Sequence, residues 1–135
     1  MSTYTVANLS GSVGKTTTVV TTAVQLAASG LRVRVVDLDP QANASTWLGY
    51  PELKGRTVAD VLRKEATISD IERPARLMQF DEDGAPILSD DAEEPIENLS
   101  LVPAARLTLD KLMVELPAVT GECCACVTPW RPPTP

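Results

Sequence analysis

The sequence predicts an α/β fold in which helices flank a parallel sheet. Two observations predict it. A loop rich in Gly and Ser separates a strand-like segment, 3–8, from a helix-like segment, 16–29. A second strand-like segment, 31–36, then ends directly in two aspartates. Strand-length segments joined by a helical one indicate a β-α-β unit, and such units build parallel sheets.

The composition or the residue spacing of each segment favours the secondary structure assigned to it. Residues 3–8 (TYTVAN) contain the β-branched and aromatic residues that favour strands. Apolar residues in 16–29 recur at the spacing of one helix face, and Gly30 provides a stop. Residues 31–36 (LRVRVV) are a strand candidate.

The loop at 9–18 is predicted to bind phosphate. Gly11 and Gly14 let consecutive backbone N–H groups converge on an anion, and the next helix adds the positive end of its dipole. Lys15 supplies charge for the outer phosphates, and the Thr16 hydroxyl can ligate Mg²⁺. The common motif has glycine where this chain has Leu9, so the alternative is an ordinary turn that binds nothing.

Asp37 and Asp39 follow the second predicted strand. Because ligands of open α/β sheets lie at the carboxyl ends of parallel strands, both carboxylates are expected to face the same crevice as the loop. If the strand extends through them, they lie on one side of it. Carboxylates there can hold Mg²⁺ through water or orient an attacking water. Alternatively, Asp39 and Pro40 begin a turn and Asp37 caps it.

The two motifs together resemble the ParA/MinD family of deviant Walker-type ATPases, and most closely its ParA-type plasmid and chromosome partition proteins. The likeness covers residues 3–50 well. It continues more loosely through a helix start at 57–62, a third strand at 98–104 and a helix at 105–116. The resemblance implies a P-loop NTPase-like parallel sheet that is incomplete at its C-terminal side.

The resemblance also implies ligands, partners and roles. It implies ATP and Mg²⁺ as cofactors, a homodimer, and, from the family alone, a ParB-like partner and non-specific DNA. Asp39 and Lys15 would be catalytic, with Asp39 activating a water, while Thr16 and Asp37 would lie at the metal. The nucleotide would be held by seven consecutive residues: Gly11, Ser12, Val13, Gly14, Lys15, Thr16 and Thr17.

Two departures from the family pattern fall in the loop. Ser10 replaces a lysine that reaches the partner's nucleotide across the dimer, and Ser12 replaces a glycine. A cation supplied in trans contributes about 10³–10⁵ in rate in comparable phosphoryl-transfer enzymes. Serine carries no charge, so we expect nucleotide binding to survive better than hydrolysis.

Two functions therefore stay open. The first is an ATP-binding partition protein that segregates plasmid or phage DNA, with weak hydrolysis. The second is a non-catalytic nucleotide-binding or interaction fragment of such an ATPase. Amidase-like and metal-cluster-assembly relatives rank third, because they usually lack the run Asp-Pro-Gln-Ala-Asn-Ala-Ser that begins at Asp39.

The chain length of 135 residues indicates one modest domain. We expect 1–120 to be the N-terminal part of a ParA-like nucleotide-binding domain with an acidic insertion at 75–97, and 121–135 to be a disordered tail of a truncated or frameshifted chain. The family's strand that would pair with 3–8 has no counterpart here, which would leave an open edge. The acidic run at 89–94 is either a solvated face or a partner contact. The three cysteines, Cys123, Cys124 and Cys126, are too few for a metal site without histidine.

Charge and hydropathy exclude several classes of function. The net charge of −6 has the wrong sign for wholesale DNA binding, and the absence of histidine excludes His-based catalysis. No apolar run reaches the length of a membrane span, and the N-terminus does not match a secretory signal. We expect a cytoplasmic protein without a membrane partner.

Overall fold

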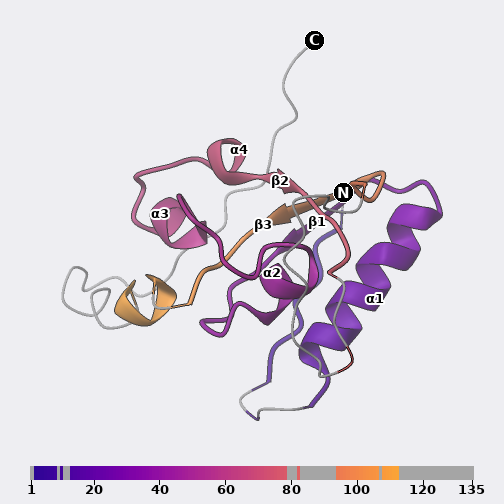
Figure 1. The fold of residues 1–135 in the computed structure, drawn as a ribbon, viewed down its shortest axis with the longest axis horizontal. Helices are drawn as coiled ribbons and strands as arrows, with labels where there is room; N and C mark the ends of the chain where they lie inside the picture. The colour runs from indigo at the N-terminus through magenta and orange to yellow at the C-terminus, as the bar shows by residue number, and fades with distance from the viewer. Residues whose placement is uncertain are drawn as a thin grey trace.

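The computed structural model describes residues 2–8, 10, 13–78, 82, 94–106 and 108–112. These residues form the mixed α/β fold that the sequence predicts (Figure 1), with the elements in the order α1 (Lys15–Ala28), β1 (Val33–Val36), α2 (Asn43–Trp47), α3 (Val58–Leu62), α4 (Ile68–Ile71), β2 (Arg73–Pro74) and β3 (Leu99–Val102). Residues 108–112 form a further helical turn.

β3 is the central strand of a three-stranded sheet with the order β1-β3-β2. β1 pairs with β3 in parallel, from Val33 opposite Leu99 to Val36 opposite Val102. β2 pairs with β3 in the antiparallel sense. The parallel pair brings the carboxyl ends of β1 and β3 to the same edge of the sheet, which is where the two aspartates follow β1.

Two apolar cores lie against the sheet. In the first, α1 and α2 pack on Val35 of β1 and on Leu99 and Leu101 of β3. In the second, residues of α3, α4 and the turn at 108–112 surround Val102. Leu101 is fully buried, which is expected of the central strand. The two cores hold the end of β3, and therefore the candidate site, in a fixed position.

Short helices begin where their caps predict. Thr57 is the N-cap of α3 and forms a capping box with Asp60, whose Oδ2 accepts the Thr57 amide at 2.6 Å. Thr67 and Asp70 form the equivalent box at α4. The helix start expected at 57–62 is therefore confirmed.

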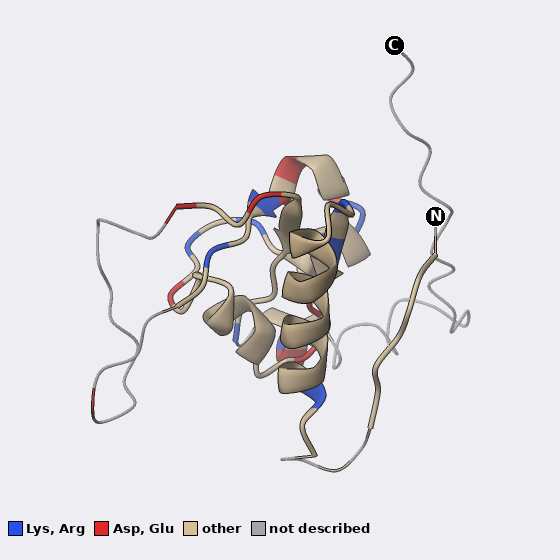
Figure 2. Ribbon diagram, turned by 90° about the vertical axis from the view of Figure 1, so that its right-hand side faces the viewer, with Lys and Arg blue, Asp and Glu red and all other residues tan. Residues whose placement is uncertain are grey.

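The strand expected at 3–8 is wrong. Residues 2–8 form no strand and are exposed, with Tyr4 at 84%. Figure 2 shows this N-terminal segment running apart from the helices. Side chains that favour strands do not form one without a neighbour for the backbone groups, and no described strand lies beside this segment.

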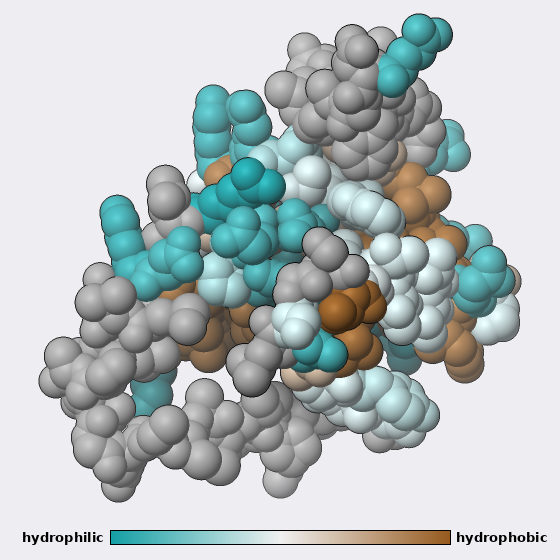
Figure 3. Space-filling view, turned by 90° about the horizontal axis from the view of Figure 1, so that it is seen from below, coloured by the Kyte–Doolittle hydropathy of each residue, from teal (hydrophilic) through white to brown (hydrophobic). Residues whose placement is uncertain are grey.

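Apolar side chains also remain at the surface of the folded part. Leu31, Leu38 and Val36 are 55%, 58% and 44% exposed at or beside β1, the edge strand. Brown patches of apolar residues interrupt the polar surface in Figure 3. Among the described helices, none combines the length and the hydropathy of a membrane span.

Several expectations lie outside the described residues. They are the acidic run at 89–94 except its last residue, most of the insertion at 75–97, the end of the helix at 113–116, and the tail at 121–135 with its three cysteines.

Candidate functional site

The loop before α1 holds the Lys15 side chain in a folded-back position. Gly14 stands at the N-cap of α1 with a left-handed φ of 82°, a conformation that glycine adopts without strain. Lys15 is the first residue of the helix, and its Nζ donates a hydrogen bond to the Ser10 carbonyl at 2.8 Å. The amine therefore reaches back from the start of α1 to Ser10, while Leu9, Gly11 and Ser12 of the predicted loop fall outside the described residues.

The first turn of α1 leaves backbone donors available. No side chain that the structure describes caps this helix, and Lys15 is its one charged residue (Figure 2). Thr16 is half-buried, and Val13 and Thr17 are exposed. Uncapped amides, the positive dipole end and an ammonium group converge at this point, and together they favour an anion such as phosphate.

Asp37 is a buried carboxylate at the carboxyl end of β1. It is 4% exposed, and its amide donates to the Val102 carbonyl at 3.0 Å, which prolongs the β1–β3 pairing. Its Oδ2 accepts the amide and the hydroxyl of Ser45 at 2.8 and 2.7 Å, and its Oδ1 accepts the Asp39 amide at 3.1 Å. Burial raises the pKa of Asp37, against the hydrogen bonds from Ser45 and Asp39, which lower it.

Asp39 lies two residues further on and is half-exposed. Its Oδ1 accepts the Gln41 amide at 2.9 Å, and its carbonyl accepts the Ala42 amide at 2.9 Å, so residues 39–42 form a tight turn. β1 ends at Val36, so the two aspartates do not share a strand face. Asp37 is buried, whereas Asp39 is accessible.

The two predicted groups of site residues lie on elements that pack together. α1, which begins at Lys15, contacts both β1 and α2. Within the described ranges, no hydrogen bond or ion pair joins Lys15 to Asp37 or Asp39.

Sequence reasoning missed two residues that hold the aspartate loop. Ser45 is fully buried, and its Oγ accepts the Ala104 amide at 2.9 Å while it donates to Asp37. Arg106 donates from Nε to the Gln41 carbonyl at 3.0 Å. No periodicity links Asp37 with Ser45 eight residues later, or either with a residue beyond 100. Only the folded chain brings them together.

A small pocket of about 180 Å³ lies between α2, the turn that follows it and residues 104–106. Ligand pockets for drug-sized molecules are usually about 300–1,000 Å³. This pocket is below that range, and none of the predicted site residues lines it.

The fold and the loop together define the class of α/β proteins that carry a phosphate-binding loop at the start of a helix. Comparison with known proteins agrees with this class. The AAA domain family matches residues 1–116, and the chain belongs to it as a ParA/MinD-type P-loop ATPase.

Several curated proteins are similar in sequence to this chain. The chain is 48% identical over 66 residues to the chromosome partitioning protein ParA of Caulobacter vibrioides, an alignment that covers 48% of this chain and 25% of the relative. It is 30% identical over 122 residues to the chromosome-partitioning ATPase Soj of Treponema pallidum, which covers 84% and 47%. It is 43% identical over 94 residues to the maintenance of carboxysome distribution protein A of Synechococcus elongatus, which covers 68% and 35%. The chain thus spans less than half the length of these relatives.

Solved structures show the same fold with nucleotide. Cobyrinic acid a,c-diamide synthase from Mycobacterium smegmatis, with bound ATP analog and magnesium, matches with a TM-score of 0.62 and 28% identity over 85% of this chain and 39% of the synthase. The septum site-determining protein MinD from Pyrococcus horikoshii, complexed with Mg-ADP, matches with a TM-score of 0.55 and 25% identity, over 84% and 42%. A diamide synthase and a septum site-determining protein therefore share the fold of this chain.

Proposed function

We propose that the chain binds ATP with Mg²⁺ and acts as a ParA-like partition protein whose hydrolysis is weak. The observation that carries the proposal is the Lys15 amine, which reaches back to Ser10 at the uncapped start of α1. The Mycobacterium smegmatis and Pyrococcus horikoshii structures support it, because both hold an adenine nucleotide or its analog together with magnesium.

The residues present fit a triphosphate and its metal. Lys15 carries a charge that only the Ser10 carbonyl engages in the described part of the chain, and a phosphate could displace that neutral acceptor. Thr16 offers a half-buried hydroxyl for Mg²⁺, and we assign Asp37 to the same metal environment, where it would act through water. Bound Mg²⁺ would neutralise charge on the phosphates. The phosphate contacts would come from Gly11, Ser12, Val13, Gly14, Lys15, Thr16 and Thr17.

Weak hydrolysis follows from what the loop lacks. The accessible carboxylate of Asp39 can orient a water, and Lys15 can stabilise charge on the outer phosphate. Ser10 is exposed and uncharged, so it cannot supply the cation that the family's lysine provides in trans. The proposed catalytic residues are therefore Asp39 and Lys15, with reduced turnover.

The cargo and the partners extend the proposal further. We propose that this chain works in the cytoplasm. Its proposed partners are a ParB-like protein, non-specific DNA and a second copy of this chain. The names of the relatives divide the possible cargo between chromosomes and carboxysomes. Residues 1–120 would form the N-terminal part of the nucleotide-binding domain, with 75–97 as an insertion and 121–135 as a tail.

A non-catalytic nucleotide-binding fragment is the second candidate. The unpaired segment 2–8 and the missing cation at Ser10 favour it. Titration with ATP and Mg²⁺ beside steady-state phosphate release separates the candidates. Release that Asp39→Asn abolishes supports the partition ATPase, and binding without release supports the fragment. If the chain neither binds ATP nor releases phosphate, both candidate functions are contradicted.

A further inference from the structure

A buried hydroxyl ties the candidate site to two strands at once. Ser45 lies in α2 and is fully buried. Its Oγ donates to Asp37 Oδ2 at 2.7 Å and accepts the Ala104 amide at 2.9 Å. Asp37 follows β1 and Ala104 lies two residues beyond β3. One side chain therefore joins the carboxyl ends of both parallel strands to the start of α2.

The same network reaches Asp39. Asp37 accepts Ser45 on one carboxylate oxygen and the Asp39 amide on the other, at 3.1 Å. Because three donors of the chain already occupy both oxygens, Asp37 holds the loop, and any contact that it makes to Mg²⁺ would run through water. The Arg106–Gln41 bond adds a second tie from the segment after β3 to the same loop.

We infer that Ser45 is a positioning residue, which acts through Asp37 to fix the loop that carries Asp39 against the ends of β1 and β3. The inference rests on the proposed function, because the position of Asp39 matters only beside a bound Mg²⁺–nucleotide. Loss of the hydroxyl would leave the Ala104 amide without its partner and Asp37 with one donor fewer. Buried groups left in that state favour rearrangement of the loop.

Amide hydrogen exchange tests the hydrogen-bond network, first in the native chain and then in Ser45→Ala. The amides of Ser45 and Ala104 should exchange as slowly as the Asp37 amide, which is paired with β3. In Ser45→Ala, the Ala104 amide should exchange at least about tenfold faster while the Asp37 amide is unchanged, as expected when one buried hydrogen bond is lost. Fast exchange at Ala104 in the native chain overturns the inference.

Nucleotide affinity tests whether the network positions the site. The quantity is the ratio of ATP affinity with Mg²⁺ to ATP affinity with EDTA. Ser45→Ala should lower this ratio about tenfold, because the Asp37 carboxylate loses the hydrogen bond from the Ser45 hydroxyl. Ser45→Thr keeps the hydroxyl and should restore the ratio. Ser100→Ala is the matched control, since it removes a half-buried hydroxyl that contacts β1 away from the loop.

The outcomes separate the inference from the proposed function. An unchanged ratio in folded Ser45→Ala, with ATP still bound, overturns the positioning role and leaves the proposed function intact. A native chain that binds no ATP while Ser45 and Ala104 are protected overturns both, since Ser45 is then only structural. A loss in Ser45→Ala that Ser45→Thr does not restore contradicts a role for the hydroxyl.

Discussion

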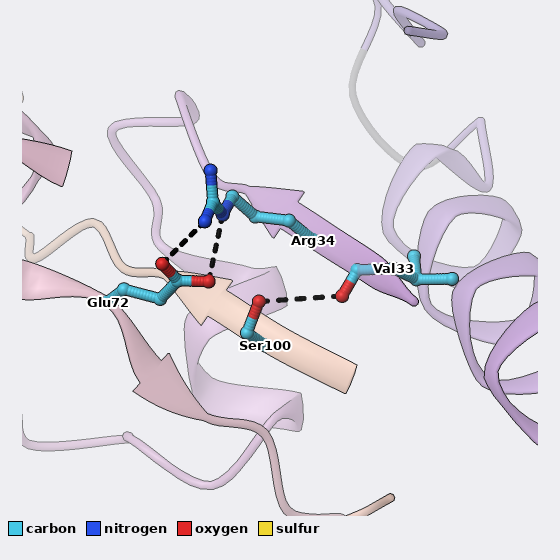
Figure 4. Close-up of polar contacts among 4 residues, drawn as sticks. All are labelled: Val33, Arg34, Glu72 and Ser100. Carbon is cyan, nitrogen blue, oxygen red and sulfur yellow. Dashed lines mark hydrogen bonds and ion pairs between the residues drawn. The ribbon is translucent and has the colours of Figure 1, made fainter. Parts of the chain in front are cut away.

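Arg34 of β1 and Glu72, the residue before β2, form a two-pronged ion pair across the central strand. Nε of Arg34 donates to Oε1 of Glu72 at 2.8 Å, and a terminal nitrogen donates to Oε2 at 2.6 Å (Figure 4). Ser100 of β3 lies between them in the sheet and donates to the Val33 carbonyl at 3.4 Å. The pair therefore links the edge strand that leads to the candidate site with the far side of the sheet.

Acidification should weaken the protein through this pair. Burial raises the pKa of Glu72, but hydrogen bonds from Arg34 and Ser100 and the charge of Arg34 outweigh it, and the pKa falls below its ordinary 4.5. A carboxylate with a lowered pKa in the folded state stabilises above pH 4.5 and loses that contribution as the pH falls through the folded pKa. Glu72→Gln should cost about 0.5–1 kcal/mol at pH 7 and less in acid.

Urea unfolding of the native chain and Glu72→Gln at neutral and acidic pH measures this difference. Glu97→Gln, which neutralises an exposed carboxylate, is the matched control. A stability difference between the native chain and Glu72→Gln that stays constant on acidification contradicts the role of the pair.

The central strand should be the most sensitive part of the core. Leu101 is fully buried between the flanking elements, so Leu101→Ala should cost about 2–5 kcal/mol through lost burial and the cavity it leaves. Leu31→Ala, at a residue 55% exposed, should cost far less. The urea midpoints of the two variants give the comparison, and similar losses would show that the sheet does not pack as described.

Replacing the exposed Lys64 by glycine should increase the stability of the protein. Lys64 follows α3 with a left-handed φ of 65°, and its amide donates to the Val61 carbonyl while the Glu65 amide donates to that of Asp60. These bonds are those of a helix end that favours glycine. Lys64→Gly should therefore stabilise the protein by about 0.5–1 kcal/mol. Thermal unfolding checks the sign, with Lys54→Gly, at a residue without positive φ, expected to be neutral or destabilising.

A cation at position 10 should raise hydrolysis. Lys15 contacts the backbone carbonyl of Ser10, so Ser10→Lys preserves that contact while it adds the charge that the family carries there. Phosphate release at saturating ATP should increase, by up to about 10³-fold if two chains associate. Ser10→Gln adds similar length without charge. Equal rates for the two variants would count against a missing cation as the cause of weak turnover.

Local signals predicted the helical part of the fold well. The apolar periodicity and the stop at Gly30 placed a helix at 16–29, and α1 spans Lys15–Ala28. Residues 98–104 contain β3, and 31–36 contain β1. The segment 3–8 has equally good strand composition yet forms none, because a strand depends on a neighbour that local sequence does not specify.

The sequence predicts which residues belong to the candidate site, but it does not predict the hydrogen bonds that hold them. The loop motif identified Lys15, and the strand end identified Asp37 and Asp39. Nothing in the local sequence indicates that Asp37 is buried and accepts hydrogen bonds from Ser45, whose own bond to the Ala104 amide joins residues 59 positions apart. Contacts of that range depend on how β1 and β3 pair, which no local pattern encodes.

The central claim is that Lys15 and the start of α1 gather the phosphates of ATP. Equilibrium titration with a fluorescent ATP analog and Mg²⁺ tests it on the native chain, Lys15→Ala and Lys54→Ala, which removes the same charge from an exposed position elsewhere. We predict saturable binding by the native chain and by Lys54→Ala, and a loss of about tenfold or more in Lys15→Ala, since a charged hydrogen bond to phosphate disappears. Equal affinity of all three proteins would contradict the account.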